Sequence, residues 1–106
     1  MKIQVNTDHN IHGHEATMES VKASVESTLG HLAEHITRVE VHITDENAMK
    51  GGRADKRCVM EARMEGHQPI AATEEAASLN DAVEGAVQKL KRLLDHTIGR
   101  LGGNRT

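Results

Sequence analysis

The chain has 106 residues, of which 37% are hydrophobic and 27% charged, with a formal net charge of -3 and no phenylalanine, tyrosine or tryptophan. This length supports one hydrophobic core rather than two, and the composition is that of a folded globular protein rather than a disordered one. The lack of aromatic side chains excludes RNA recognition by stacking bases on phenylalanine or tyrosine.

The sequence also argues against a membrane or secreted protein. No apolar run approaches the ~18 residues of a membrane-spanning helix. The first residues, MKIQVNT, alternate polar with apolar side chains instead of forming the apolar block of a signal peptide. A single cysteine, Cys58, leaves no internal disulfide, which fits a reducing compartment. We therefore expect a cytoplasmic protein that makes no contact with a membrane.

Periodicity predicts four strands and two helices. Residues 2–7 alternate and predict a first strand. Apolar residues three or four apart from Met18 to Leu32 predict an amphipathic helix that begins near Glu15 and ends between Gly30 and Glu34. Residues 36–44, 57–64 and 69–73 predict three more strands. Their expected inward-facing residues in the second and third strands are Val39, Val41, Ile43, Cys58, Met60, Ala62 and Met64.

The last element carries the strongest helical pattern. Ser78 and Asp81, three residues apart, resemble a capping box with aspartate in place of glutamate. Gly102 and Gly103 are expected to end the helix. Seven apolar residues between these points recur at helical spacing: Leu79, Val83, Val87, Leu90, Leu94, Ile98 and Leu101.

The order β-α-β-β-β-α predicts an α+β fold of two layers. We expect a four-stranded sheet with both helices on one face, as in double-stranded-RNA-binding domains, and a polar opposite face. The first two strands should be parallel, because a helix connects them, and the other neighbours antiparallel. Residues 1–101 are expected to form a single domain, and residues 102–106 a flexible C-terminal tail.

Positive charge is concentrated in the last helix. Residues 1–86 carry 8 basic and 15 acidic side chains, whereas residues 87–106 carry 5 and 1. At ~100° per residue, one flank of the helix holds Lys89, Arg92, His96 and Arg100, and the opposite flank holds Glu84, Gln88, Lys91 and Asp95. Such a stripe suits the phosphates of a nucleic acid. The alternative is a solvated face whose basic residues complement the helix dipole.

The element order, the hairpin VEVHITDENAMKGGRADKRCVMEAR and the helix SLNDAVEGAVQKLKRLL together resemble the bacterial ribosome-hibernation factors. These proteins are also called ribosome-associated inhibitors or ribosomal subunit interface proteins. The resemblance covers residues 1 to about 101. Because the chain ends soon after the second helix, it is similar to the short members, which lack an additional C-terminal domain.

The resemblance implies a translation inhibitor that acts under stress and catalyses no reaction. Its partner would be the small ribosomal subunit, whose RNA it would contact in the channel for messenger and transfer RNA. It implies no cofactor and no small-molecule substrate. The residues at matching positions that would contact RNA are Lys89, Arg92 and Arg100, with Lys91 as a fourth candidate from the other flank. The basic stripe adds His96 to these candidates. A second basic group in the hairpin offers further contacts: Lys50, Arg53, Lys56 and Arg57.

Two other hypotheses follow from the residues. The first helix holds four glutamates, Glu15, Glu19, Glu26 and Glu34, and one lysine, so a protein of the same fold could instead bind another protein through that helix or the open sheet face. Histidines in HNIHGHE, at His9, His12 and His14, and the pair His31 and His35, suggest a metal-binding module. Because their spacing matches no zinc motif, we expect no metal site, and no arrangement of side chains indicates a catalytic one.

Overall fold

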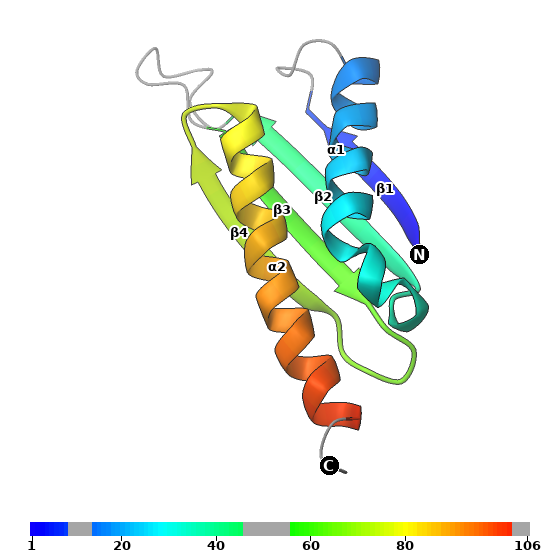
Figure 1. The fold of residues 1–106 in the computed structure, drawn as a ribbon. Helices are drawn as coiled ribbons and strands as arrows, with labels where there is room; N and C mark the ends of the chain where they lie inside the picture. Colours follow the sequence, from blue (N-terminus) through cyan, green and yellow to red (C-terminus); the bar gives the residue numbers. More distant parts are fainter. Residues whose placement is uncertain (9–13, 46–55, 103–106) are drawn as a thin grey trace.

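The computed structural model describes residues 1–8, 14–45 and 56–102, apart from the side chains of His14, Leu101 and Gly102. The elements follow the predicted order (Figure 1). They are β1 (Lys2–Thr7), α1 (His14–Leu29), a 3-10 helix η1 (Gly30–His35), β2 (Arg38–Asp45), β3 (Lys56–Arg63), β4 (Ile70–Ala76) and α2 (Leu79–Gly102).

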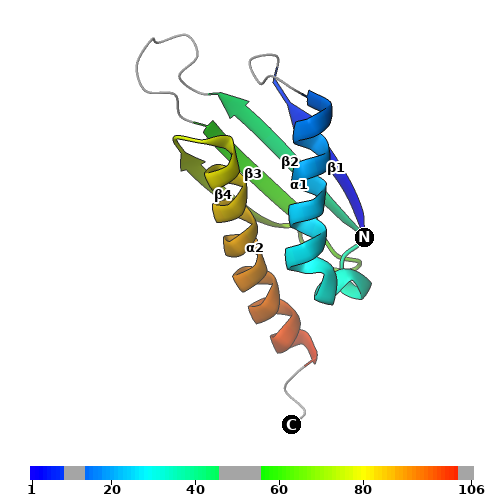
Figure 2. The same cartoon turned by 45° about the horizontal axis from the view of Figure 1, so that its top comes forward.

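The four strands form one sheet in the order β1-β2-β3-β4. As predicted, β1 pairs with β2 in parallel, and the pairs β2–β3 and β3–β4 are antiparallel. Both helices lie on the same face of this sheet, which is visible from two directions (Figures 1 and 2). Helix α1 contacts β1 and α2, while α2 contacts β3 and β4. The predicted two-layer α+β fold is therefore confirmed.

The core lies between the sheet and the helices, and aliphatic side chains fill it. In β2 and β3 every second residue is buried, because successive side chains of a strand point to opposite faces. In α1 the buried residues recur every four positions, at Val21, Val25 and Leu29. The predicted inward-facing residues of the second and third strands are all buried, and among the described residues no polar or charged one is.

Local sequence explains where α2 begins. The hydroxyl oxygen of Ser78 accepts a hydrogen bond from the backbone N–H of Asp81 at 3.1 Å, which confirms the predicted N-cap. Leu90 and Leu94 are fully buried, and Leu79 and Ile98 pack against the edge of the core. The helix continues through Gly102, one residue past the expected end of the domain.

The fourth strand differs from its prediction. Instead of ending at Thr73, β4 continues to Ala76, so that Glu74 and Glu75 are strand residues. The extension pairs with the start of β3, where Cys58 lies opposite Glu74 and Arg57 opposite Glu75. Backbone pairing with a neighbouring strand thus outweighs the low strand propensity of glutamate. Glu74 consequently points to the helical face and Glu75 to the open face.

Candidate nucleic-acid interface

The outer flank of α2 carries the four residues that the sequence placed there, Lys89, Arg92, His96 and Arg100, and is called the basic flank below. All four side chains are exposed. The N-terminal end of the flank lies beside β4, because Lys89 contacts the backbone of that strand. Leu90 and Leu94, which are buried on the inner side of α2, fix this orientation of the helix. A row of basic side chains along an exposed helix is suited to binding phosphate groups.

Lys89 is held by β4 rather than free in solvent. Its Nζ lies 2.6 Å from Oε1 of Glu74 and donates a hydrogen bond to the carbonyl oxygen of Thr73 at 3.0 Å. A glycine in α2 makes room for the carboxylate, since a Cβ at Gly85 would lie 2.5 Å from Cγ and 2.7 Å from Cδ of Glu74. The positive charge of Lys89 is therefore compensated within the chain.

Arg92 differs from Lys89 in this respect. It is exposed, and nothing in residues 1–8, 14–45 and 56–102 forms an ion pair or side-chain hydrogen bond with it. It borders a shallow depression of about 270 Å³ whose other lining residues are Ala72, Lys89 and Leu93. Leu93 is 45% exposed and is the one large hydrophobic residue that the described part of the chain leaves exposed. This combination of an unpaired guanidinium and an apolar surface can contact both a phosphate and an uncharged part of a ligand.

The opposite flank of α2 faces α1 and η1 and forms contacts between helices. Nζ of Lys91 lies 3.0 Å from Asp95, and Nε2 of His31 lies 3.1 Å from the same carboxylate. Hydrogen bonds from Lys91 and then from His31 lower the pKa of Asp95 below its ordinary value. About two turns before Lys91, the hydroxyl of Ser24 donates a hydrogen bond to Glu84 at 2.8 Å. Lys91 is thus occupied by Asp95 on this side, away from the basic flank.

The second group of predicted RNA contacts is only partly described. Lys50 and Arg53 lie outside the described residues. Lys56 is partly buried and its Nζ lies 3.2 Å from Asp45, directly across the β2–β3 pair. Arg57 is exposed, and strand alternation places it on the open face of the sheet, because its neighbour Cys58 is buried on the other face.

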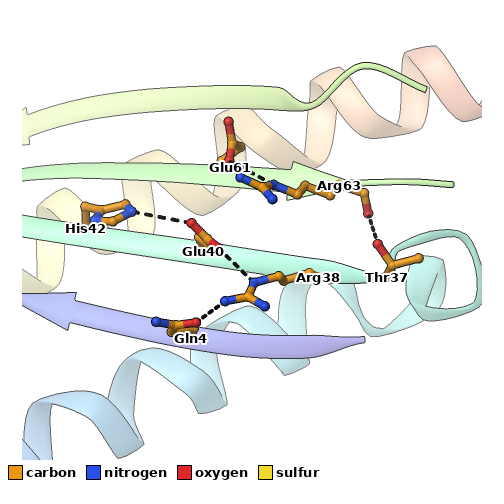
Figure 3. Close-up of polar contacts among 7 residues, drawn as sticks. All are labelled: Gln4, Thr37, Arg38, Glu40, His42, Glu61 and Arg63. Carbon is orange, nitrogen blue, oxygen red and sulfur yellow. Dashed lines mark hydrogen bonds and ion pairs between the residues drawn. The ribbon is translucent and has the colours of Figure 1, made fainter. Parts of the chain in front are cut away.

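The open face of the sheet carries a polar network instead of a core (Figure 3). Arg38 donates a hydrogen bond to Gln4 of β1, and its Nε lies 2.8 Å from Glu40. Glu40 also lies 3.7 Å from Nε2 of His42. On β3, the guanidinium of Arg63 donates two hydrogen bonds to Glu61, at 3.1 and 3.2 Å. The charges of Arg38 and Arg63 are therefore compensated by carboxylates on the same face.

The structure describes only some of the histidines that suggested a metal site. His9 and His12, and the side chain of His14, lie outside the described residues, whereas His31 contacts Asp95 and His35 is exposed. Within the described ranges, no group of three His, Cys, Asp or Glu residues is placed to hold a metal ion. Cys58 is fully buried, and this burial raises the pKa of its thiol to about 12.

Two residues of this region were not predicted from the sequence. Glu74 was missed because its strand was expected to end at Thr73, and Leu93 because it falls outside the apolar stripe of the helix. The sequence did contain a signal for Leu93. This residue follows Arg92 directly and lies outside the apolar stripe of the helix, where an apolar side chain is not needed for the core.

Comparison with known proteins places the chain in a family. The family model described as sigma 54 modulation protein / S30EA ribosomal protein matches residues 5–101. A search of curated proteins finds no match. Among solved structures, a ribosomal subunit interface protein from Coxiella burnetii is similar with a TM-score of 0.70 and 15% sequence identity, covering 93% of this chain and 99% of that one.

The N-terminal domain of Protein Y from Thermus thermophilus is similar with a TM-score of 0.64 and 20% identity, covering 92% of this chain and 99% of that one. At these identities the two solved structures show a shared fold only, whereas the family model shows similarity of sequence. No helix in the described part of the chain is both long and apolar enough to cross a membrane. The match over residues 5–101 shows that the chain belongs to the sigma 54 modulation protein / S30EA ribosomal protein family.

Proposed function

We propose that this protein is a ribosome-associated translation inhibitor that binds the RNA of the small subunit through the basic flank of α2. In this proposal it occupies the channel for messenger and transfer RNA during stress and acts by excluding those ligands. Membership of the S30EA ribosomal protein family supports a ribosomal partner. The observation that carries the RNA contact is Arg92, exposed on the basic flank and without a compensating carboxylate in the described ranges.

Arg92 is the centre of the proposed interface for an electrostatic reason. A guanidinium can form two parallel hydrogen bonds with a phosphate, and such charge-assisted bonds contribute about 1.5–3 kcal/mol each. His96 and Arg100 follow Arg92 at intervals of four residues, about one helical turn each, so they can contact successive phosphates. Lys91 and the hairpin residues Lys50, Arg53, Lys56 and Arg57 are secondary candidates in the same proposal.

Cosedimentation with purified small subunits tests the proposal. Wild-type protein should cosediment at low salt and dissociate as salt rises, because each phosphate contact releases counterions. The triple variant Lys89→Glu, Arg92→Glu, Arg100→Glu should not cosediment, and Arg92→Glu alone should bind at least about tenfold more weakly. Lys2→Glu, which reverses one charge at the far edge of the sheet, is the matched control and should bind as wild type does. Wild-type binding by the triple variant would refute the RNA contact.

Acidic residues on α1 favour a second candidate, a protein-interaction module of the same fold. Glu15, Glu19 and Glu26 are all exposed on this helix and would repel RNA. A partner bound through this helix would be basic, and its binding would be lost with Glu19→Lys and Glu26→Lys but not with Arg92→Glu. Because a protein of this second kind does not bind ribosomes, wild-type protein that fails to cosediment with small subunits would favour it, whereas wild-type protein that cosediments would favour the first candidate.

A further inference from the structure

An ion pair between Glu74 and Lys89 lies in the interface between α2 and β4. Glu74 points to the helical face and its side chain fills the space that Gly85 leaves, with Cγ 2.5 Å from where a Cβ would be. Lys89 lies one turn further along the helix and makes two contacts with β4, to the Glu74 carboxylate at 2.6 Å and to the Thr73 carbonyl at 3.0 Å. The space left by Gly85 and the carbonyl oxygen of Thr73 thus hold the Glu74–Lys89 ion pair in place.

This arrangement has a consequence for any anion that approaches the basic flank. A phosphate near Nζ of Lys89 would meet the carboxylate of Glu74 within a few ångströms, and the Glu74 side chain is 29% exposed, so its charge is not hidden from the ligand. The pair has no net charge, whereas Arg92, three residues later, presents a full positive charge. The attraction at this end of the flank is therefore reduced to that of one cation.

We propose that Glu74 masks Lys89 and thereby limits the affinity of the basic flank for RNA, so that Arg92 and not Lys89 makes the first contact. The inference rests on the proposed function for its biological meaning, but the masking itself concerns any polyanion. In this view the affinity for the ribosome is set by a residue of β4 that does not touch RNA. An inhibitor that must leave the ribosome when growth resumes gains from such a limit, since weaker binding means faster release.

The sequence offers a matched pair of variants. Glu74→Gln removes the masking charge and keeps the shape of the side chain. Glu75→Gln makes the same change of net charge one residue later, but on the open face of the sheet. Glu74→Gln should bind small subunits about three- to tenfold more tightly than Glu75→Gln, the size expected for one charge a few ångströms from a phosphate at a solvated surface. Equal affinities for the two variants would overturn the proposal.

Lys89→Gln completes the test as a double-variant cycle. If the pair contributes no net attraction, the double variant Glu74→Gln, Lys89→Gln should bind within about twofold of wild type, since no net charge is added or removed. Lys89→Gln alone should bind more weakly, because it leaves the Glu74 carboxylate uncompensated. A double variant that binds as weakly as Lys89→Gln alone would mean that Lys89 contacts RNA despite Glu74, and the proposal would be wrong.

A second readout separates this inference from the proposed function. Elution from immobilised heparin measures attraction to a polyanion without a ribosome, and Glu74→Gln should elute at higher salt than Glu75→Gln. If this order holds while the wild type fails to cosediment with small subunits, the proposed function fails and the masking stands. If the two variants elute together, the masking is refuted whatever the ribosome assay gives. Far-UV circular dichroism of each variant should match the wild type, which excludes misfolding as the cause.

Discussion

Replacing Gly85 with alanine should have opposite effects on stability in two backgrounds. In the interior of a helix, alanine is favoured over glycine by about 1 kcal/mol, so Gly85→Ala would ordinarily stabilise α2. Here the new Cβ would lie 2.5 Å from Cγ and 2.7 Å from Cδ of Glu74, closer than two carbon atoms can approach. Because Cγ is near the root of the side chain, Glu74 must leave its position or β4 and α2 must separate.

The free energy lost to steric crowding at position 85 exceeds the free energy gained from the helix propensity of alanine. Overpacking of this kind costs about 1–3 kcal/mol. Loss of the ion pair with Lys89 adds at most about 1 kcal/mol, since both side chains are partly exposed to solvent. We therefore expect Gly85→Ala to destabilise the otherwise wild-type protein by about 1 kcal/mol. In a Glu74→Ala background the obstacle is absent, and the same substitution should stabilise the protein by about 1 kcal/mol. The coupling between the two sites is then about 2 kcal/mol.

Urea denaturation followed by far-UV circular dichroism measures these free energies. Intrinsic fluorescence is not an option, because the chain contains no tryptophan or tyrosine. A shift of 1 kcal/mol corresponds to about 4–8 °C in the melting temperature of a domain this size, which is easily resolved. The reasoning would be refuted if Gly85→Ala stabilised the protein equally with and without Glu74.

Three further outcomes are expected. Leu90→Ala should cost about 2–5 kcal/mol in urea denaturation, because Leu90 is fully buried, whereas Leu93→Ala should cost under about 1. The Cys58 thiol, with a pKa of about 12, should resist a maleimide in the native protein at pH 7 and react in urea. Asp95→Asn should lower the free energy of unfolding by a few tenths of a kcal/mol at pH 7. Because the folded pKa of Asp95 is lowered, its contribution is present above the unfolded pKa and disappears as the pH falls through the folded one, so variant and wild type should converge in acid.

The sequence predicts this fold well because its periodic signals are strong. Val39, Val41 and Ile43 alternate with polar residues, and one aliphatic stripe runs along α2, so each element can bury a face in only one way. The one larger difference, the end of β4, arises where pairing with β3 replaces local preference. Glu74 and Glu75 are poor strand residues, and nothing local indicates that Cys58 and Arg57 lie opposite them.

The sequence predicts which residues share the basic flank. It does not predict which of their charges are compensated by carboxylates. Helical spacing is a local property, so the sequence places Lys89 and Arg92 on one flank correctly. Whether each cation has a partner depends on contacts between elements that are distant in the chain. Glu74 reaches Lys89 from a neighbouring strand, and His31 reaches Asp95 from η1. The first of these contacts compensates the charge of Lys89. Neither contact can be predicted from the spacing of residues within one helix.

Helix α2 is longer than the sheet that supports it. Its 24 residues span ~36 Å at ~1.5 Å per residue, whereas the 7 residues of β4 span only ~23 Å at ~3.3 Å per residue. The C-terminal turns accordingly extend past the strands (Figure 1), and Leu94 is the last fully buried residue among the side chains of α2 that the structure describes, up to Arg100. Beyond that point Ile98 packs against the core while only partly buried, so amide protons there should exchange with solvent faster than those around the fully buried Leu90. We therefore expect the last turns of α2 to open more readily than the turns around Leu90, which the core holds.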